Sequence, residues 1–153
     1  MLRLLVVLAL ALPSLARAQT RPVANLVVGD GVVGIKRASD GRVYIGASSG
    51  SHTTALTVSA AAAGQFVSDA QALVRLGTRP TPKHVLDQPV LEEDTTGRSL
   101  SFTRHVQKEH GTPVVTYHFF VADDRLSGFA LIASPAEAKS VLAALRNASG
   151  MRP

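Results

Sequence analysis

The same succession of strand-like and helix-like segments occurs twice in this sequence, and this repetition constrains the fold more than any other feature. Short apolar runs separated by turn residues lead into an alanine-rich segment with helical spacing, first in residues 19–77 and again in residues 99–150. At an offset of 75 positions, Ala55–Ser59 falls on Ala130–Ser134. The end of a strand, a capping serine and the register of a helix agree together, which favours an internal duplication.

Both expected helices have recognisable ends. Ser59 is a good N-cap for a helix over residues 60–76, and Gly77 follows it as the C-terminal glycine. Ser134–Glu137 combines an N-cap serine, a proline at N1 and a capping-box glutamate at N3, and it opens a helix that reaches about residue 148. The apolar positions recur at steps of three and four, so we expect buried stripes containing Phe66, Val67 and Leu73, and Val141, Leu142 and Leu145.

Turn residues divide the apolar runs into hairpins. Asp40-Gly41 lies between residues 32–38 and 42–47 and suits a type I′ turn, in which both central residues need positive φ. His110-Gly111 is expected to form the corresponding turn in the other half. These two turns are offset by 70 positions (110 − 40) instead of 75, so the second hairpin should be longer by five residues.

Each half therefore predicts four strands followed by one helix, a ββββα unit. Two such units would set an antiparallel sheet against two helices, an α+β fold. Residues 78–98 are polar and contain three prolines, so we expect a linker with at most one short strand, near residues 89–93. The expected layout is one globular domain over residues 19–153, with halves 19–77 and 99–150.

Residues 1–18 have the pattern of a cleavable signal peptide. Arg3 precedes an uncharged apolar stretch, Leu4–Leu15, and Ala16-Arg17-Ala18 places small residues where signal peptidase reads them. A stretch of 12 residues is too short for a membrane-spanning helix, which needs about 20. We expect cleavage after Ala18, a secreted or periplasmic protein, and no transmembrane segment after cleavage.

Charge and cysteine content exclude some classes of function. Arg3 and Arg17 leave with the leader, so 14 basic residues (16 − 2) face 11 acidic ones, a net charge of +3. This mild excess suits weak attraction to an anionic surface but does not require a nucleic acid. The chain has no cysteine, which excludes disulfides, thiolate nucleophiles and cysteine-ligated metals, and favours a bacterial periplasm or exterior.

The first half carries residues of a known kind of repeat. These are Gly41–Ile45, Leu56–Ser59, Phe66 in the helix and Leu76-Gly77 at its end. Over residues 32–77 this pattern resembles a Pur-type repeat, the ββββα unit of single-stranded nucleic-acid-binding proteins. The second half keeps Leu131–Ser134 and the helix stripe but lacks the Gly-Arg turn. The resemblance implies the ββββα topology and adds single-stranded nucleic acid to the candidate ligands.

Two glycine motifs lack the structural context that catalysis or cofactor binding would need. Gly29–Gly34 spells GxGxxG but continues into a hairpin, whereas a dinucleotide site needs a helix there. Gly46–Gly50 spells GxSxG but a strand follows it, whereas a nucleophile elbow needs a helix. We interpret the glycines of the first motif as turn residues, and the second motif as a serine-glycine turn. No carboxylate pair suggests acid–base chemistry either, so we expect no cofactor and favour a protein that is not an enzyme.

Basic and aromatic residues near the hairpin turns form a candidate polyanion-binding face. Sheets that bind single-stranded nucleic acid combine cations with exposed rings on which bases stack. The candidates are Lys36, Arg37, Arg42 and Tyr44 in the first hairpin, and Arg104 in the second. Alternation along the second hairpin places Tyr117 and Phe119 on a core face. The alternative interpretation is that these cations are simply solvated.

Two histidines form a candidate metal site. If His110-Gly111 is a two-residue turn, His105 opposes Thr116 and His118 opposes Thr103, so the imidazoles are diagonal neighbours on one face. A zinc site would need three or four ligands, and the sequence places no third ligand beside them. The alternative is a solvated polar face.

Our first hypothesis for function is an exported, non-enzymatic binding or assembly module whose partner is a protein or a polyanion. One alternative is binding of single-stranded nucleic acid or another polyanion by the sheet face, although export argues against nucleic acid as the natural partner. Another is a small metal-binding or hydrolytic protein that uses His105 and His118. Homo-oligomerisation remains open.

Overall fold

The computed structural model describes residues 20–123 and 127–151. The predicted signal peptide and its cleavage site lie outside these residues. The elements follow in the order β1 (Thr20–Val28), β2 (Gly31–Ala38), β3 (Val43–Ser49), β4 (His52–Val58), α1 (Ala60–Leu76), β5 (Val90–Glu92), β6 (Ser99–Glu109), β7 (Thr112–Asp123), β8 (Ser127–Ala133) and α2 (Pro135–Ser149). In the part of the chain described, neither helix is long and apolar enough to cross a membrane.

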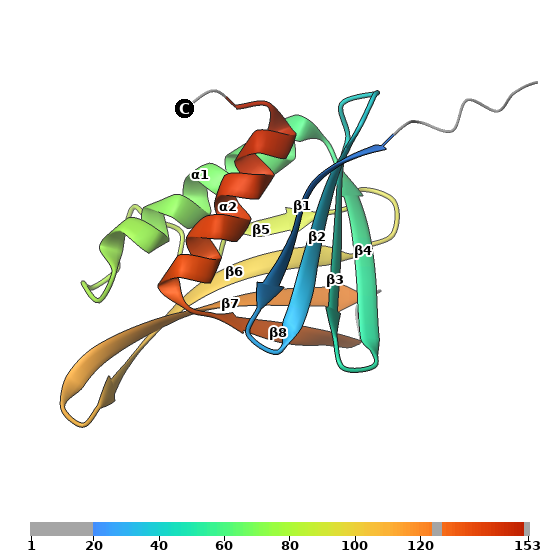
Figure 1. Ribbon diagram of the computed structural model, residues 1–153. Coiled ribbons are helices and arrows are strands. Elements are labelled where there is room, and N and C mark those ends of the chain that lie inside the picture. The colour runs from blue at the N-terminus through green and yellow to red at the C-terminus, as the bar shows by residue number, and fades with distance from the viewer. Residues whose placement is uncertain (1–19, 124–126, 152–153) are drawn as a thin grey trace, which may run out of the picture.

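The strands form two separate antiparallel sheets. The first has the order β1-β2-β3-β4 and the second the order β5-β6-β7-β8, and their strands run across one another (Figure 1). The α+β class and the two ββββα halves are thus confirmed. β5 is a short strand that lies within the segment expected to contain one.

Local capping agrees with the sequence patterns. Ser59 Oγ accepts a hydrogen bond from the Ala62 N–H at 3.1 Å, and Ser134 takes part in a complete capping box with Glu137. β4 and β8 each have seven residues and lie 75 positions apart. The predicted strand, serine cap and helix therefore occur in both halves.

The two hairpin turns differ. His110 and Gly111 both have positive φ, 49° and 84°, as a type I′ turn requires. In the first hairpin only Gly41 has positive φ. The Ala38 N–H donates to the Arg42 carbonyl at 3.0 Å, so residues 39–41 form a three-residue loop. The type I′ prediction for Asp40-Gly41 is therefore wrong. Such loops combine a type I turn with a left-handed residue, here the glycine.

The second hairpin is longer, as expected. β6 and β7 have 11 and 12 residues, against 8 and 7 in β2 and β3. Its end projects from the body of the protein (Figure 1). Glu109 pairs with Thr112 next to the turn, which is the predicted register.

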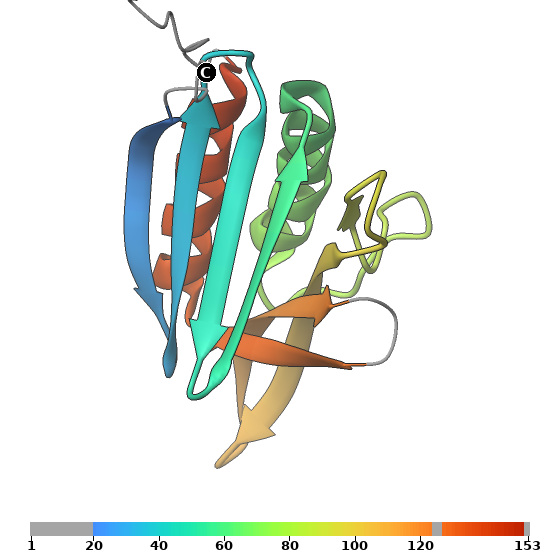
Figure 2. The same ribbon diagram turned by 90° about the vertical axis from the view of Figure 1, so that its right-hand side faces the viewer.

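Each helix covers the sheet of the other half. α2 contacts β1, β2 and β3 and, to a smaller extent, β7 and β8 of its own half, whereas α1 contacts β5 and β6, and the helices lie side by side (Figures 1 and 2). The segment after β5 also binds the free edge of β4. There, the Glu93 carboxylate accepts from the Thr57 N–H at 2.9 Å, and the Arg98 guanidinium donates to the Ala55 carbonyl at 3.0 Å. Each half therefore packs against elements of the other half.

One core fills the space between sheets and helices. The predicted stripes are buried in both helices, including Phe66, Leu73, Leu142 and Leu145. Phe102 packs between the rings of Tyr117 and Phe119, with centroid distances of 5.4 and 4.9 Å. The Tyr117 hydroxyl donates to the Val74 carbonyl at 3.3 Å, and burial raises its pKa above the ordinary value of 10.0. The rings of the second hairpin's inner face thus belong to the core, as alternation predicted.

Candidate functional site

A groove of about 460 Å³ crosses the first sheet on the face that points away from the helices, here called the outer face. Figure 2 views this sheet with both helices behind it. Alternate residues of β2 and β3, such as Val33 and Ile45, are buried against the helices. The residues between them face outward and line the groove, because side chains alternate along a strand.

The floor of the groove is a row of small residues, here called the glycine row. Cross-strand pairing connects Asn25 to Gly34, Gly34 to Gly46, and Gly46 to Ala55, one residue from each strand. Neither Gly34 nor Gly46 has positive φ. A Cβ added at Gly46 would find its nearest neighbour, the Gly34 carbonyl oxygen, only at 4.0 Å. At Gly46, therefore, neither backbone conformation nor crowding requires a glycine.

The two walls of the groove differ in character. One wall consists of Val32, Ser48 and Thr53, which pair in a row. Lys36 and Tyr44 face each other on β2 and β3 and form the other wall. Lys36 is the one charged side chain among the described residues that line the groove. The site therefore offers a small floor, one ring and one cation.

The structure separates the other predicted polyanion-binding residues from this pair. Arg42 is exposed and lies 3.6 Å from Asp40 in an ion pair. The Arg37 guanidinium lies against Gly150, at the C-terminal end of α2, where a cation interacts favourably with the helix dipole. Arg104 is engaged by the end of α1 and the segment after it, since it donates to Gly77, Arg79 and Thr81. Of the five candidates, Lys36 and Tyr44 share the groove.

His105 and His118 stack on each other on the second sheet. Their ring centroids are 3.9 Å apart with an interplanar angle of 20°. The pairing of His105 with Thr116 and of His118 with Thr103 confirms the predicted register. Burial, and to a smaller extent the His105 imidazole, lowers the pKa of His118 below its ordinary value of 6.5. Among the described residues, no group of three or more potential ligands gathers around a common point.

The glycine row was not anticipated from the sequence. Gly34 belongs to the motif with glycines interpreted as turn residues, but it lies inside β2, so that interpretation is wrong for Gly34. Gly46 lies inside β3, within the extended run expected over residues 42–47. The turn interpretation is correct for Gly29 and Gly50, which lie in turns. Alternation of buried residues through Val33, Ile35, Ile45 and Ala47 is the signal that continues each strand through its glycine.

Comparison with protein-family models and with curated proteins finds no match for this chain. The Pur-type resemblance therefore stays a prediction made from residue types.

Proposed function

We propose that this protein is an exported, non-enzymatic binding module that holds an extended anionic ligand in the groove of the first sheet. The proposal of export comes from the signal-peptide pattern of residues 1–18. The proposal of binding comes from the glycine row.

Gly46 supports binding because it weakens the sheet without a local structural need. At Gly34 an added Cβ would lie 3.0 Å from Asn25 Oδ1, so the Asn25 side chain already covers that part of the floor. Glycine in a strand interior costs backbone entropy and packs no side chain, and it often occurs where a ligand approaches the backbone closely. Gly34 and Gly46 face each other in adjacent strands. With strands about 4.8 Å apart, the row extends for about 14 Å across four strands. This is room for a single extended chain lying across the strands.

The charge of the lining supports an anionic ligand. Lys36 is opposite Tyr44, and no carboxylate occurs among the described residues of the lining. A polyanion could pair a charged group with the ammonium and pack a flat group on the ring. Single-stranded nucleic acid remains the alternative ligand, because base stacking on an aromatic ring contributes about 1–3 kcal/mol per base. With one such ring we expect micromolar or weaker affinity at physiological salt, and no preference for single-stranded DNA over heparin.

Gly46→Val tests the proposal. Heparin and a short oligo(dT) serve as probes, and binding is measured at low salt by calorimetry and mapped by NMR chemical shifts. We expect shift changes along the glycine row in the wild type, and at least a tenfold loss of affinity in the variant, because the new side chain fills the floor. Ala130→Val is the matched control, since it adds a similar side chain to an exposed position of β8.

Each outcome decides the proposal. If neither heparin nor oligo(dT) binds the wild type at low salt, the proposal of an anionic ligand is wrong. Equal affinity of Gly46→Val and wild type, or equal loss in Ala130→Val, would overturn the groove as the site. Strong, base-dependent binding that Tyr44→Ala abolishes would establish the nucleic-acid alternative.

A further inference from the structure

We infer that His105 and His118 form a two-histidine chelate for a borderline transition-metal ion, with Cu²⁺ bound most tightly. This site lies on the second sheet and is separate from the groove. The test of this site is therefore independent of the test of the proposed function.

The backbone already holds the two imidazoles together. They project from adjacent strands at diagonal positions, and the ring centroids are 3.9 Å apart. Two nitrogens bound to one ion at about 2.0 Å each and cis to one another lie about 3 Å apart. Stacked rings this close need only a rotation about the side-chain bonds to direct two nitrogens at a common ion.

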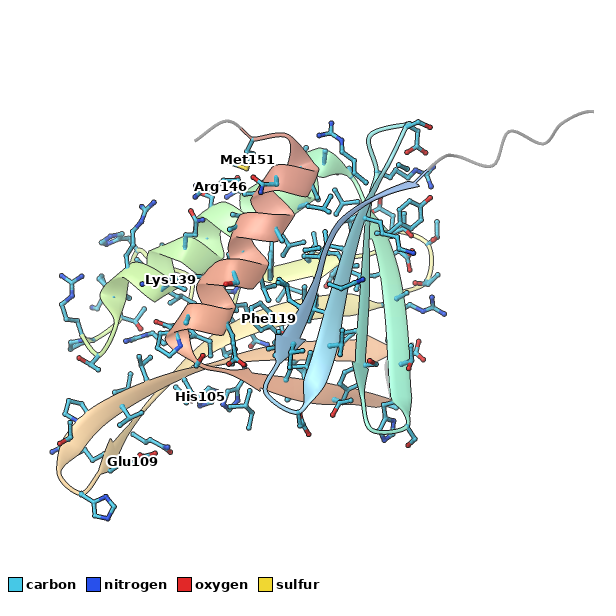
Figure 3. The ribbon with its side chains drawn as sticks, viewed as in Figure 1. His105, Glu109, Phe119, Lys139, Arg146 and Met151 are labelled. Carbon is cyan, nitrogen blue, oxygen red and sulfur yellow. The ribbon has the colours of Figure 1, made fainter. Side chains whose placement is uncertain are left out.

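The surroundings leave the exposed His105 ring free to make that rotation, whereas the half-buried His118 holds its side of the site in place. His105 is exposed, and its Nε2 lies 3.2 Å from the Thr103 hydroxyl, a weak neutral contact that an ion would replace. Within the described residues, neither imidazole forms an ion pair with a carboxylate. His105 and Glu109 lie along the projecting hairpin (Figure 3), where an ion can enter from solvent.

The number of ligands selects the metal. The described residues provide no third ligand at this place, so water would complete the coordination. Structural zinc sites require four protein ligands, whereas Cu²⁺ accepts a tetragonal arrangement of two imidazoles and water. Imidazole affinity also rises through the divalent series from Mn²⁺ to Cu²⁺ and falls again at Zn²⁺. We therefore expect the order Cu²⁺, then Ni²⁺ and Zn²⁺.

Binding would connect β6 to β7 at the base of the projecting hairpin. An ion that binds the native state and not the unfolded chain raises the melting temperature in proportion to the logarithm of its concentration above Kd. Thermal unfolding therefore provides a readout besides direct titration.

The experiment uses the mature chain without an affinity tag and titrates it with Cu²⁺. We expect one ion per chain, an electron paramagnetic resonance spectrum with two equatorial nitrogens, and a rise in melting temperature. His105→Gln and His118→Gln should each weaken binding at least tenfold and remove one nitrogen from the spectrum. His110→Asn is the control on the same hairpin, since asparagine tolerates the positive φ of that position.

Unchanged Cu²⁺ affinity in either His105→Gln or His118→Gln would overturn the inference, as would a comparable loss in His110→Asn. His105 is exposed, so its substitution leaves the core intact. Circular dichroism of each variant confirms that it is folded.

Discussion

The two sheets have the same strand order but differ in the size of the side chains along one equivalent row of positions. Val43 pairs with Val58, and Tyr117 pairs with Ala133, which lies 75 positions after Val58. Tyr117 thus corresponds to Val43, and three positions further along Phe120 corresponds to Gly46. The row that is Asn25, Gly34, Gly46 and Ala55 in the first sheet is Val90, Ser101, Phe120 and Ala130 in the second.

This difference shows which positions the fold requires. On the inner faces, the corresponding residues Val43 and Tyr117 are both fully buried in the core. On the outer faces, one sheet has an open floor at Gly46, and the other carries a phenylalanine that is 43% exposed and lies over Gly128. The second sheet therefore accepts a large side chain at this position, where Gly128 leaves room for the ring, and the residue that corresponds to Gly128 in the first sheet is Thr53. Gly46 is therefore a feature of the first sheet that the second sheet lacks.

The largest expected effect tests whether the two sheets share one core. Leu142 is buried in α2, which covers the first sheet although it belongs to the second half. Leu142→Ala should lower the free energy of unfolding by about 2–5 kcal/mol, the usual cost of such a cavity. Urea unfolding measures the loss. Hydrogen exchange should rise in both sheets together, and a rise in only one sheet would show that the halves unfold separately.

Removing the side chain that fills the second sheet's row should have a smaller effect. Phe120→Ala should cost about 1 kcal/mol, because burying a whole phenylalanine contributes about 1.5–3 kcal/mol and this ring is only partly buried. Heparin binding should stay unchanged, since the positions equivalent to Lys36 and Tyr44 are Thr103 and His118. A loss of heparin affinity equal to that in Gly46→Val would place ligand on the second sheet and contradict the comparison.

The smallest effect concerns the two helix starts. α2 has Glu137 in its first turn, whereas α1 has no acidic residue there. Hydrogen bonds from the Ser134 backbone and side chain, and from the Gly29 N–H, lower the pKa of Glu137 below its ordinary value of 4.5. Its charge therefore stabilises the folded state above about pH 4.5, and this contribution is lost as the pH falls through the folded pKa.

Glu137→Gln keeps the capping geometry but removes the charge. We expect a melting temperature that falls less than the wild type's between neutral and acidic pH, with the two curves meeting at the acid end. The pair of pH profiles, measured by circular dichroism, gives the test. Parallel profiles would show that Glu137 does not contribute.

Local signals predicted much of this structure. Ser59, Ser134 and Glu137 mark helix starts through bonds within one turn, and His110-Gly111 determines the register that brings His105 beside His118. These features depend on residues close in sequence. The choice of sheet that each helix covers does not depend on residues close in sequence, because both helices bear similar apolar stripes and could pack on either sheet.

The glycine row could not be predicted from the sequence for a related reason. Its members come from four strands, and their alignment depends on the turns that connect those strands, including the three-residue turn at Gly41. A strict two-residue turn at Asp40-Gly41 would have placed Ala47, not Gly46, opposite Gly34. A shift of one residue in register moves a side chain to the other face.

The most direct test of the central claim transfers the second sheet's residue to the first. Gly46→Phe should stay folded with an unfolding free energy at least equal to that of the wild type, because strands favour aromatic residues over glycine and the position is open. At low salt the same protein should lose at least tenfold in affinity for heparin and oligo(dT). Wild-type affinity in a folded Gly46→Phe variant would contradict the account, because the groove would then not be the binding site.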